Sequence, residues 1–204
     1  SGQPNGGAKC VVIISHLGRP AGNYKREDFT LAPVAQYLRQ CLGPKFPVEF
    51  LPDCVGADIV ARTHNCRHGT VFLCENLRFH VEEIGATINA EGKEVHATPE
   101  AVRAFCAELG KLGDIFVNDA YACAHRPHTS VVLNSIALRV AGLCMQRELH
   151  AYARLLTPRT LDERTGKRTG PEAPFVAVVG SAMRVKDKAR LLLNLLDRVD
   201  VLMI

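Results

Sequence analysis

The most constraining feature of this sequence is an alternation of short apolar runs with longer stretches of helical character. Most runs are rich in β-branched residues and apolar throughout, rather than at every second position. Strands of this kind are typical of a parallel sheet that is covered by helices on both faces. The runs are 10–15, 48–51, 70–74 and 115–117. The sequence therefore predicts an α/β fold with a doubly wound parallel sheet.

Helix signals mark the stretches between these runs. Thr30 is expected to cap the first helix and Gly43 to end it. The clearest helix has Thr98 as its cap and Pro99 at its first position, where the missing proline N–H costs nothing. The predicted helices are 31–42, 56–63 and 100–112.

The character of the sequence changes after about residue 141. An amphipathic helix is followed by a stretch rich in charge, Thr, Gly and Pro, and then by a strand, a helix and another strand. We interpret this last β-α-β unit as the opening of a second domain, within which the chain is expected to stop. The predicted organisation is an N-terminal domain at 1–144, an interdomain helix at 145–156, an exposed loop at 157–174 and the start of the second domain at 175–204.

Composition narrows the classes of protein. The longest apolar runs are far shorter than the roughly 18 residues of a membrane-spanning helix, and the polar, uncharged start does not resemble a secretory signal. The net charge of +4 arises from basic residues that are interspersed with acidic ones. Because a nucleic-acid binder concentrates its positive charge on a stripe or tail, a small anionic ligand is favoured over nucleic acid.

Eight cysteines also need an interpretation, and no two of them form a C-x-x-C pair. Most lie inside apolar stretches, where a free cysteine behaves as a small hydrophobic residue. Reduced thiols in a cytosol-like compartment are therefore favoured over a disulfide framework. The cysteines are Cys10, Cys41, Cys54, Cys66, Cys74, Cys106, Cys123 and Cys144.

Three strands are followed by loops that pair an arginine with histidine. The loops are 15–20 (SHLGRP), 75–80 (ENLRFH) and 118–128 (NDAYACAHRPH). Ligands of an open parallel sheet bind beyond the carboxyl ends of its strands, and the guanidinium fork grips phosphate or carboxylate with two hydrogen bonds. The alternative, solvated loop charges, is weaker because other loops lack this pattern. The sequence therefore predicts a basic pocket for a small polyanion, formed by these three loops.

A second candidate phosphate site follows the strand of the second domain. Gly180 and Ser181 allow a tight turn, and the expected helix N-terminus behind them would present free N–H groups. Arg184, Lys186 and Lys188 would add positive charge. Because a Gly-Ser turn before a helix is common, this signal is less specific than the three basic loops.

Four other groups are interpreted as structural or solvated, because each lacks a further feature that its chemistry needs. A P-loop needs a glycine five places before its Gly-Lys, a metal site needs more ligands, and a thiol nucleophile needs a fixed base. The groups are the P-loop-like stretch 166–169 with Leu161 at the glycine position, the cluster His64, Cys66 and His68, the pair Cys123 and His125, and the solvated carboxylates Glu82 and Glu83.

The three basic loops resemble the substrate-domain motifs of the phosphoglycerate kinase family, in the same order and at compatible spacing. The stretch with Glu82 and Glu83 after the second loop is also similar. Further matches are 31–35 (LAPVA), 52–56 (PDCVG), 109–114 (LGKLGD) and 186–188 (KDK). The resemblance extends from about residue 10 to residue 204.

This resemblance implies two Rossmann-like domains that close around a hinge for in-line phosphoryl transfer. It assigns His16, Arg19, Arg78 and Arg126 to 3-phosphoglycerate or 1,3-bisphosphoglycerate. It assigns Gly180, Ser181 and Lys188 to ADP or ATP, and places Arg184 where the family has its catalytic lysine. Mg²⁺ is implied through the nucleotide and no protein metal site is expected. A monomeric, cytoplasmic glycolytic enzyme with no membrane or nucleic-acid partner is also implied.

Departures from the family pattern keep two alternatives open. The family's first strand and most of its nucleotide domain have no counterpart here, so these residues alone are expected to be inactive. Met183-Arg184 and Ala122-Cys123 replace the family's usual residues, which would suit a divergent, non-catalytic relative that binds an anion or serves for interaction. A purely structural α/β module is the third interpretation, and the three basic loops disfavour it.

Overall fold

The computed structural model describes residues 7–20, 26–89, 91–156, 160–169, 174–180, 193–196 and 198–203. The chain divides into two compact units, Ser1–Gly142 and Leu143–Ile204, which we treat separately. None of the helices in the described ranges is long and apolar enough to cross a lipid bilayer.

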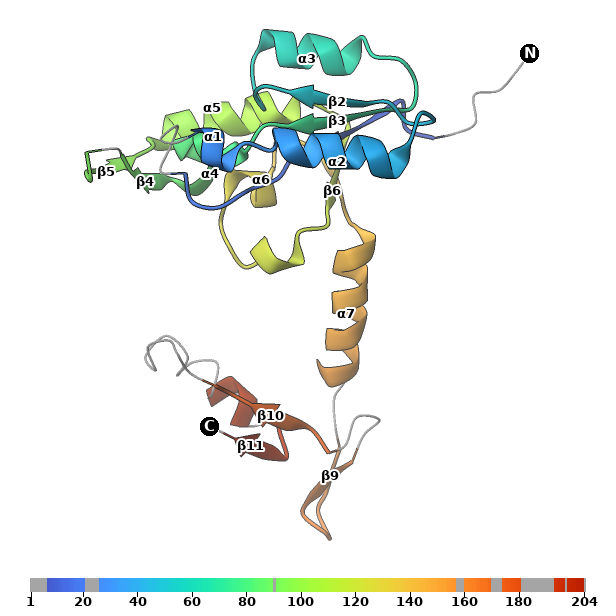
Figure 1. The fold of residues 1–204 in the computed structure, drawn as a ribbon. Helices are drawn as coiled ribbons and strands as arrows, with labels where there is room; N and C mark the ends of the chain where they lie inside the picture. Colours follow the sequence, from blue (N-terminus) through green and yellow to red (C-terminus); the bar gives the residue numbers. More distant parts are fainter. Residues whose placement is uncertain are drawn as a thin grey trace. The chain divides into compact units, whose positions relative to one another are not determined.

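A three-stranded parallel sheet forms the centre of the first unit (Figure 1). Its strands are β1 (Cys10–Ile13), β2 (Val48–Leu51) and β3 (Thr70–Cys74), in the order β1-β3-β2. Cys10 lies opposite Thr70 and Val48 opposite Val71. A second parallel pair joins β6 (Ile115–Asn118) to β7 (Leu138–Ala141). All four apolar runs are therefore strands, as predicted.

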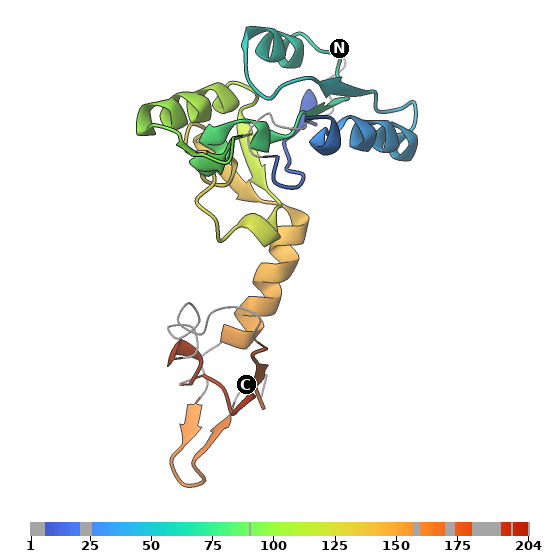
Figure 2. The same cartoon turned by 60° about the vertical axis from the view of Figure 1, so that its left-hand side comes forward.

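The sheet is covered on both faces because alternate residues of β3 point to opposite sides. Phe72 and Cys74 belong to one core cluster, with residues of α3 (Ala57–His64) and α5 (Pro99–Gly110). Leu73 belongs to a second cluster, with Leu31 and Ala35 at the start of α2 (Ala32–Leu42). Figure 1 and Figure 2 show α2 and α3 on opposite sides of the sheet. This arrangement confirms the predicted doubly wound α/β fold.

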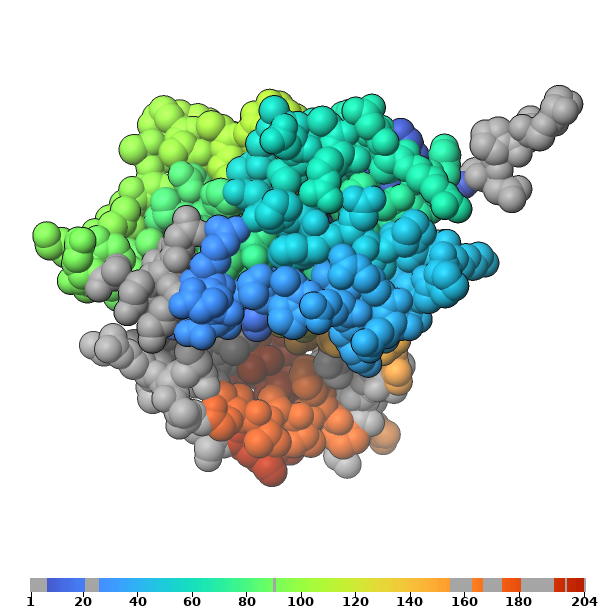
Figure 3. All heavy atoms as spheres, turned by 45° about the horizontal axis from the view of Figure 1, so that its top comes forward, coloured from blue at the N-terminus to red at the C-terminus, as the bar shows by residue number. Residues whose placement is uncertain are grey.

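In Figure 3, the atoms of α2, of the segment through α3 and of α5 lie next to one another on the face in view.

Shorter elements complete the first unit. The antiparallel pair of β4 (Ala86–Ile88) with β5 (Glu94–His96) was not among the predicted elements, and neither was the strand β7. The remaining elements are α1 (Arg26–Phe29), a 3-10 turn at Leu77–Phe79, α4 (Val81–Ile84), a 3-10 turn at Tyr121–Cys123 and α6 (Thr129–Val132).

The start of α2 differs from the prediction. The cap position is occupied by Leu31 rather than Thr30, because the carboxylate of Glu75 accepts hydrogen bonds from both residues. The Thr30 hydroxyl donates to Glu75 Oε2 over 2.6 Å and accepts from the N–H of Ala32. Gly43 ends the helix as predicted, with a φ of 65° that suits glycine.

The cap of α5 agrees with the prediction. Thr98 accepts a hydrogen bond from the N–H of Ala101 over 3.2 Å, and Pro99 is the first helical residue. Three cysteines, Cys54, Cys74 and Cys106, are buried in the core as small hydrophobic residues. Burial raises the pKa of Cys74 to about 12 and raises that of Cys54 well above its ordinary value, so neither thiol is poised to react.

The second unit begins with α7 (Leu143–Leu156), two residues earlier than predicted. The stretch expected as an exposed loop contains an antiparallel hairpin, β8 (Thr160–Asp162) with β9 (Lys167–Thr169). A parallel pair follows, β10 (Val176–Val178) with β11 (Val201–Met203). Residues 193–196 between these strands are helical. The strands of the predicted β-α-β unit are thus present, while most of its helix lies outside the described residues.

Candidate functional site

Two of the predicted basic loops meet because β1 and β3 are parallel neighbours. The N–H of Leu77 donates to the carbonyl of Ser15 over 3.2 Å. The buried side chain of Asn76 donates to the carbonyl of Leu17 over 2.8 Å and accepts from the N–H of Leu17 over 3.2 Å. Its amide also reaches the carbonyl of Phe29 over 2.9 Å. Asn76 therefore fixes the backbone of the loop that carries His16.

The first residues of the second basic loop are structural. Glu75 is buried, and its Oε1 accepts from the N–H groups of Leu31 and Asn76 over 2.8 and 2.7 Å. Leu77 and Phe79 are buried apolar residues. Within this loop the buried residues therefore hold the backbone, while Arg78 is half-buried at the site.

The side chain of Arg78 joins the two loops. Its Nη1 donates to the carbonyl of Gly18 over 2.7 Å. Gly18 has a φ of 57°, and a β-carbon there would collide with the ring of Phe29. Glycine is required at this position for both reasons. The close packing holds the carbonyl that orients Arg78.

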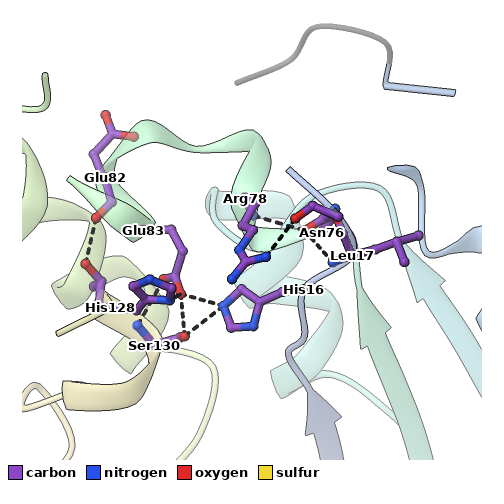
Figure 4. Close-up of polar contacts among 10 residues, drawn as sticks. His16, Leu17, Asn76, Arg78, Glu82, Glu83, His128 and Ser130 are labelled. Carbon is purple, nitrogen blue, oxygen red and sulfur yellow. Dashed lines mark hydrogen bonds and ion pairs between the residues drawn. The ribbon is translucent and has the colours of Figure 1, made fainter. Parts of the chain in front are cut away.

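The third loop meets the other two at the carboxylate of Glu83. Its Oε1 lies 2.6 Å from His16 Nε2 and accepts the hydroxyl of Ser130 over 2.5 Å. Its Oε2 accepts the N–H of Ser130 over 3.0 Å. Figure 4 shows Glu83 between His16 on one side and His128 and Ser130 on the other. The expectation that Glu83 is solvated was wrong: it is buried and links all three loops.

His128 lies beside this cluster and was missed as a candidate. Its ring is edge-on to that of His16, with 5.8 Å between centroids, and its Nδ1 lies 3.8 Å from Glu83 Oε1. In the described part of the chain this buried Nδ1 has no hydrogen-bond partner. Its place at the end of a basic loop was the available sequence signal.

The charge environment of His128 is set by opposing influences. Burial lowers the pKa of His128, the carboxylate of Glu83 opposes this, and the positive charges of Arg78 and Arg126 lower it further. His16 acts in the same direction. The neutral ring is therefore favoured, within the electrostatic reach of two arginines that come from different loops.

The other predicted residues occupy varied places. Arg19 is exposed in the loop that carries His16, and Arg126 is exposed on the loop after the 3-10 turn Tyr121–Cys123. Gly180 is exposed just after β10. Ser181, Arg184, Lys186 and Lys188 lie outside the described residues.

Among the residues that the structure describes, two side-chain clusters have the spacing of a metal site. One ligand atom from each of His16, Glu83 and His128 lies within 4.8 Å of the others, and the same holds for Asp53, Cys54 and His80. In the first, both carboxylate oxygens already accept hydrogen bonds. In the second, the buried thiol holds its proton strongly. Imidazole and thiol groups also suit Mg²⁺ poorly.

The comparisons with known proteins agree with these features. A family model described as phosphoglycerate kinase matches residues 4–204. Phosphoglycerate kinase of Candida albicans is 43% identical over 196 residues, covering 96% of this chain and 43% of the relative. That of Dictyostelium discoideum is 44% identical over 198 residues, covering 97% of this chain and 43% of the relative. The chain thus spans less than half the length of these relatives.

Solved structures give the same result. Phosphoglycerate kinase of Coxiella burnetii superposes with a TM-score of 0.62 at 34% identity, covering 94% of this chain and 40% of the other. That of Pyrococcus horikoshii superposes with a TM-score of 0.65 at 27% identity, covering 96% and 42%. By sequence and by fold, this chain belongs to the phosphoglycerate kinase family.

Proposed function

We propose that this chain forms the phosphoglycerate-binding part of a phosphoglycerate kinase. The reaction is the reversible transfer of a phosphoryl group between 1,3-bisphosphoglycerate with ADP and 3-phosphoglycerate with ATP. The observation that carries the proposal is the meeting of three basic loops at Glu83, which brings His16, Arg78 and His128 to one edge of the sheet.

The chemistry of this site is binding and orientation. Phosphoryl transfer needs little covalent participation by the protein, and is accelerated mainly by holding the reactants in line and by positive charge around the migrating group. Arg78, Arg126 and Arg19 would supply positive charge that holds the phosphoglycerate, and would recognise its phosphate or carboxylate with two hydrogen bonds each. Asn76 and Gly18 contribute indirectly, because they hold the loops that carry these side chains.

The nucleotide would bind to the second unit. We assign Gly180, Ser181 and Lys188 to its phosphates and Arg184 to the migrating group. Leu143–Leu156 would be the interdomain helix, and closure of the two domains would exclude water. Mg²⁺ would arrive with the nucleotide and neutralise phosphate charge, and we assign it no ligand in this chain. We also propose that the protein is monomeric and cytoplasmic.

The pocket assignment is tested by substituting one exposed arginine at the site and one elsewhere. Arg126→Ala should weaken 3-phosphoglycerate binding, measured by calorimetry, by about tenfold or more, because a charge-assisted hydrogen bond contributes about 1.5–3 kcal/mol. Arg103→Ala is the matched control, because Arg103 is exposed on α5 and paired with Glu100. Equal affinities of the two variants would refute the assignment.

A divergent relative that binds the anion without turnover is the alternative function. It is favoured by Ala122 and Cys123, which lie in the 3-10 turn before Arg126, and by Arg184 at the place of the family lysine. A coupled assay of ATP formation from 1,3-bisphosphoglycerate and ADP separates the two. Binding of 3-phosphoglycerate without ATP formation would support the alternative, whereas turnover at an ordinary enzymatic rate would exclude it.

A further inference from the structure

We propose that Glu83 is a positioning residue that fixes His16 in the tautomer with its proton on Nε2. It thereby leaves the lone pair on Nδ1, which can accept a hydrogen bond from the hydroxyl of a bound phosphoglycerate. The role of Nδ1 towards the ligand rests on the proposed function, whereas the tautomer of His16 is a property of the unliganded protein and is independent of it.

The surroundings of Glu83 favour an ionised carboxylate that accepts hydrogen bonds. Its side chain is fully buried, and it is satisfied by donors from two other segments of the chain. His16 lies 67 residues before it and Ser130 lies 47 residues after it. A buried carboxylate is stable only when donors compensate for the lost water. Glu83, in α4, thus connects the loop after β1 to the start of α6 through hydrogen bonds.

The proton positions follow from counting donors and acceptors. An ionised carboxylate can only accept hydrogen bonds. The Ser130 hydroxyl donates its only proton to Glu83 Oε1 over 2.5 Å, so its oxygen can only accept from His16. His16 Nε2 then faces two acceptors, Glu83 Oε1 at 2.6 Å and Ser130 Oγ at 3.3 Å. A lone pair on Nε2 would face those oxygens without a proton between them, so Nε2 carries the hydrogen.

The ring of His128 also packs against that of His16. The two rings meet edge to face with an interplanar angle of 65° (Figure 4). His128 Nδ1 is 3.8 Å from Glu83 Oε1, which is beyond hydrogen-bond distance. Glu83 therefore orients His16 directly, and His128 contributes packing.

The substitution Glu83→Gln tests this with almost no change in shape. Glutamine has one acceptor oxygen, whereas Glu83 uses two. If that oxygen keeps the bond from the Ser130 N–H, the amide NH₂ faces His16 Nε2, which must then accept. We expect the proton of His16 to move from Nε2 to Nδ1 in this variant.

The measurement is a two-bond ¹H–¹⁵N correlation spectrum of protein labelled with ¹⁵N-histidine, recorded at a pH where His16 is neutral. The His16 signal is assigned by its loss in His16→Gln. The expected result is the Nε2–H pattern in the wild type and the Nδ1–H pattern in Glu83→Gln. Glu82→Gln is the matched control. Within the described part of the chain, Glu82 takes part in hydrogen bonding only through its backbone carbonyl, which accepts from the hydroxyl of Thr129.

Affinity for 3-phosphoglycerate provides the functional measurement. We expect Glu83→Gln to weaken binding about tenfold, equivalent to about 1.4 kcal/mol, because a protonated Nδ1 can no longer accept from the hydroxyl of the ligand. We expect Glu82→Gln to leave the affinity unchanged. An Nδ1–H pattern in the wild type would overturn the proposal even if the variant failed to fold. An unchanged tautomer in a folded Glu83→Gln would also overturn it. Absence of 3-phosphoglycerate binding by the wild type would instead refute the proposed function, and the tautomer result would still stand.

Discussion

Two histidine–carboxylate pairs of the first unit have similar geometry but different surroundings. His16 Nε2 lies 2.6 Å from Glu83 Oε1, and His80 Nε2 lies 2.8 Å from Asp53 Oδ1. The side chains of the first pair are 13% and 0% exposed, whereas those of the second are 26% and 41% exposed. The distances alone would rank the pairs as equivalent.

The difference lies in what happens when one partner is removed. Water can solvate Asp53 or His80 after loss of the other, so the pair contributes little net stability. Water does not reach Glu83, whose loss would leave buried donors on Ser130 and His16 unpaired. Burial rather than distance therefore distinguishes the pair that holds loops together from the solvent-accessible pair that contributes little to stability.

The largest expected effect is on the free energy of unfolding. Glu83→Ala should lower it by about 3–5 kcal/mol, as expected when a buried partner is removed, and Asp53→Ala by no more than about 1 kcal/mol. Urea unfolding followed by circular dichroism measures both. Similar losses in the two variants would show that exposure is not what separates the pairs.

A smaller effect is expected from pH, through the histidine beside the buried pair. Because burial lowers the pKa of His128, the unfolded chain binds a proton more readily than the folded chain does. Stability is then complete above the ordinary histidine pKa of about 6.5 and is lost as pH falls toward the folded value. The urea concentration at the midpoint of unfolding should fall between pH 7.5 and pH 5.5, and this fall should be larger in the wild type than in His128→Gln. His125→Gln, on the exposed part of the same loop, should behave as the wild type.

The contrast between these pairs also explains what the sequence could predict. The core strands were found because their apolar runs are local signals, as at β3, where Phe72, Leu73 and Cys74 are all buried. The strand β7 was missed because Arg139 interrupts its short apolar run. The cap at Thr30 was misplaced because Glu75, 45 residues later, accepts from its hydroxyl.

The same difference between local signals and long-range contacts applies to the candidate site. The three basic loops were predicted from strand-end position and residue type, which are local signals. Glu83 was misread because α4 (Val81–Ile84) carries two adjacent acidic residues, and nothing local distinguishes the buried one. Its burial depends on Ser130 and His16, which are distant in sequence. Long-range packing, rather than propensity, decides the role of such a residue.

The smallest expected effect belongs to the exposed pair, and its direction is fixed by the pKa of Asp53. Burial alone would raise that pKa, but hydrogen bonds from His80 and from the N–H of Cys54 hold it below its ordinary value. The folded chain therefore releases this proton more readily than the unfolded chain. The resulting stability is present above the ordinary pKa of about 3.9 and is lost as pH falls through the folded value.

The test compares the wild type with Asp53→Asn and His80→Gln in urea between pH 6 and pH 3.5. At pH 6 the wild type should exceed Asp53→Asn by no more than about 1 kcal/mol, and this advantage should shrink toward the acid end. His80→Gln should retain part of it, because the bond from the Cys54 N–H to Asp53 Oδ1 does not involve the imidazole. An advantage that grows on acidification would reverse the sign. It would mean that burial, rather than hydrogen bonding, dominates at Asp53, as it does at His128.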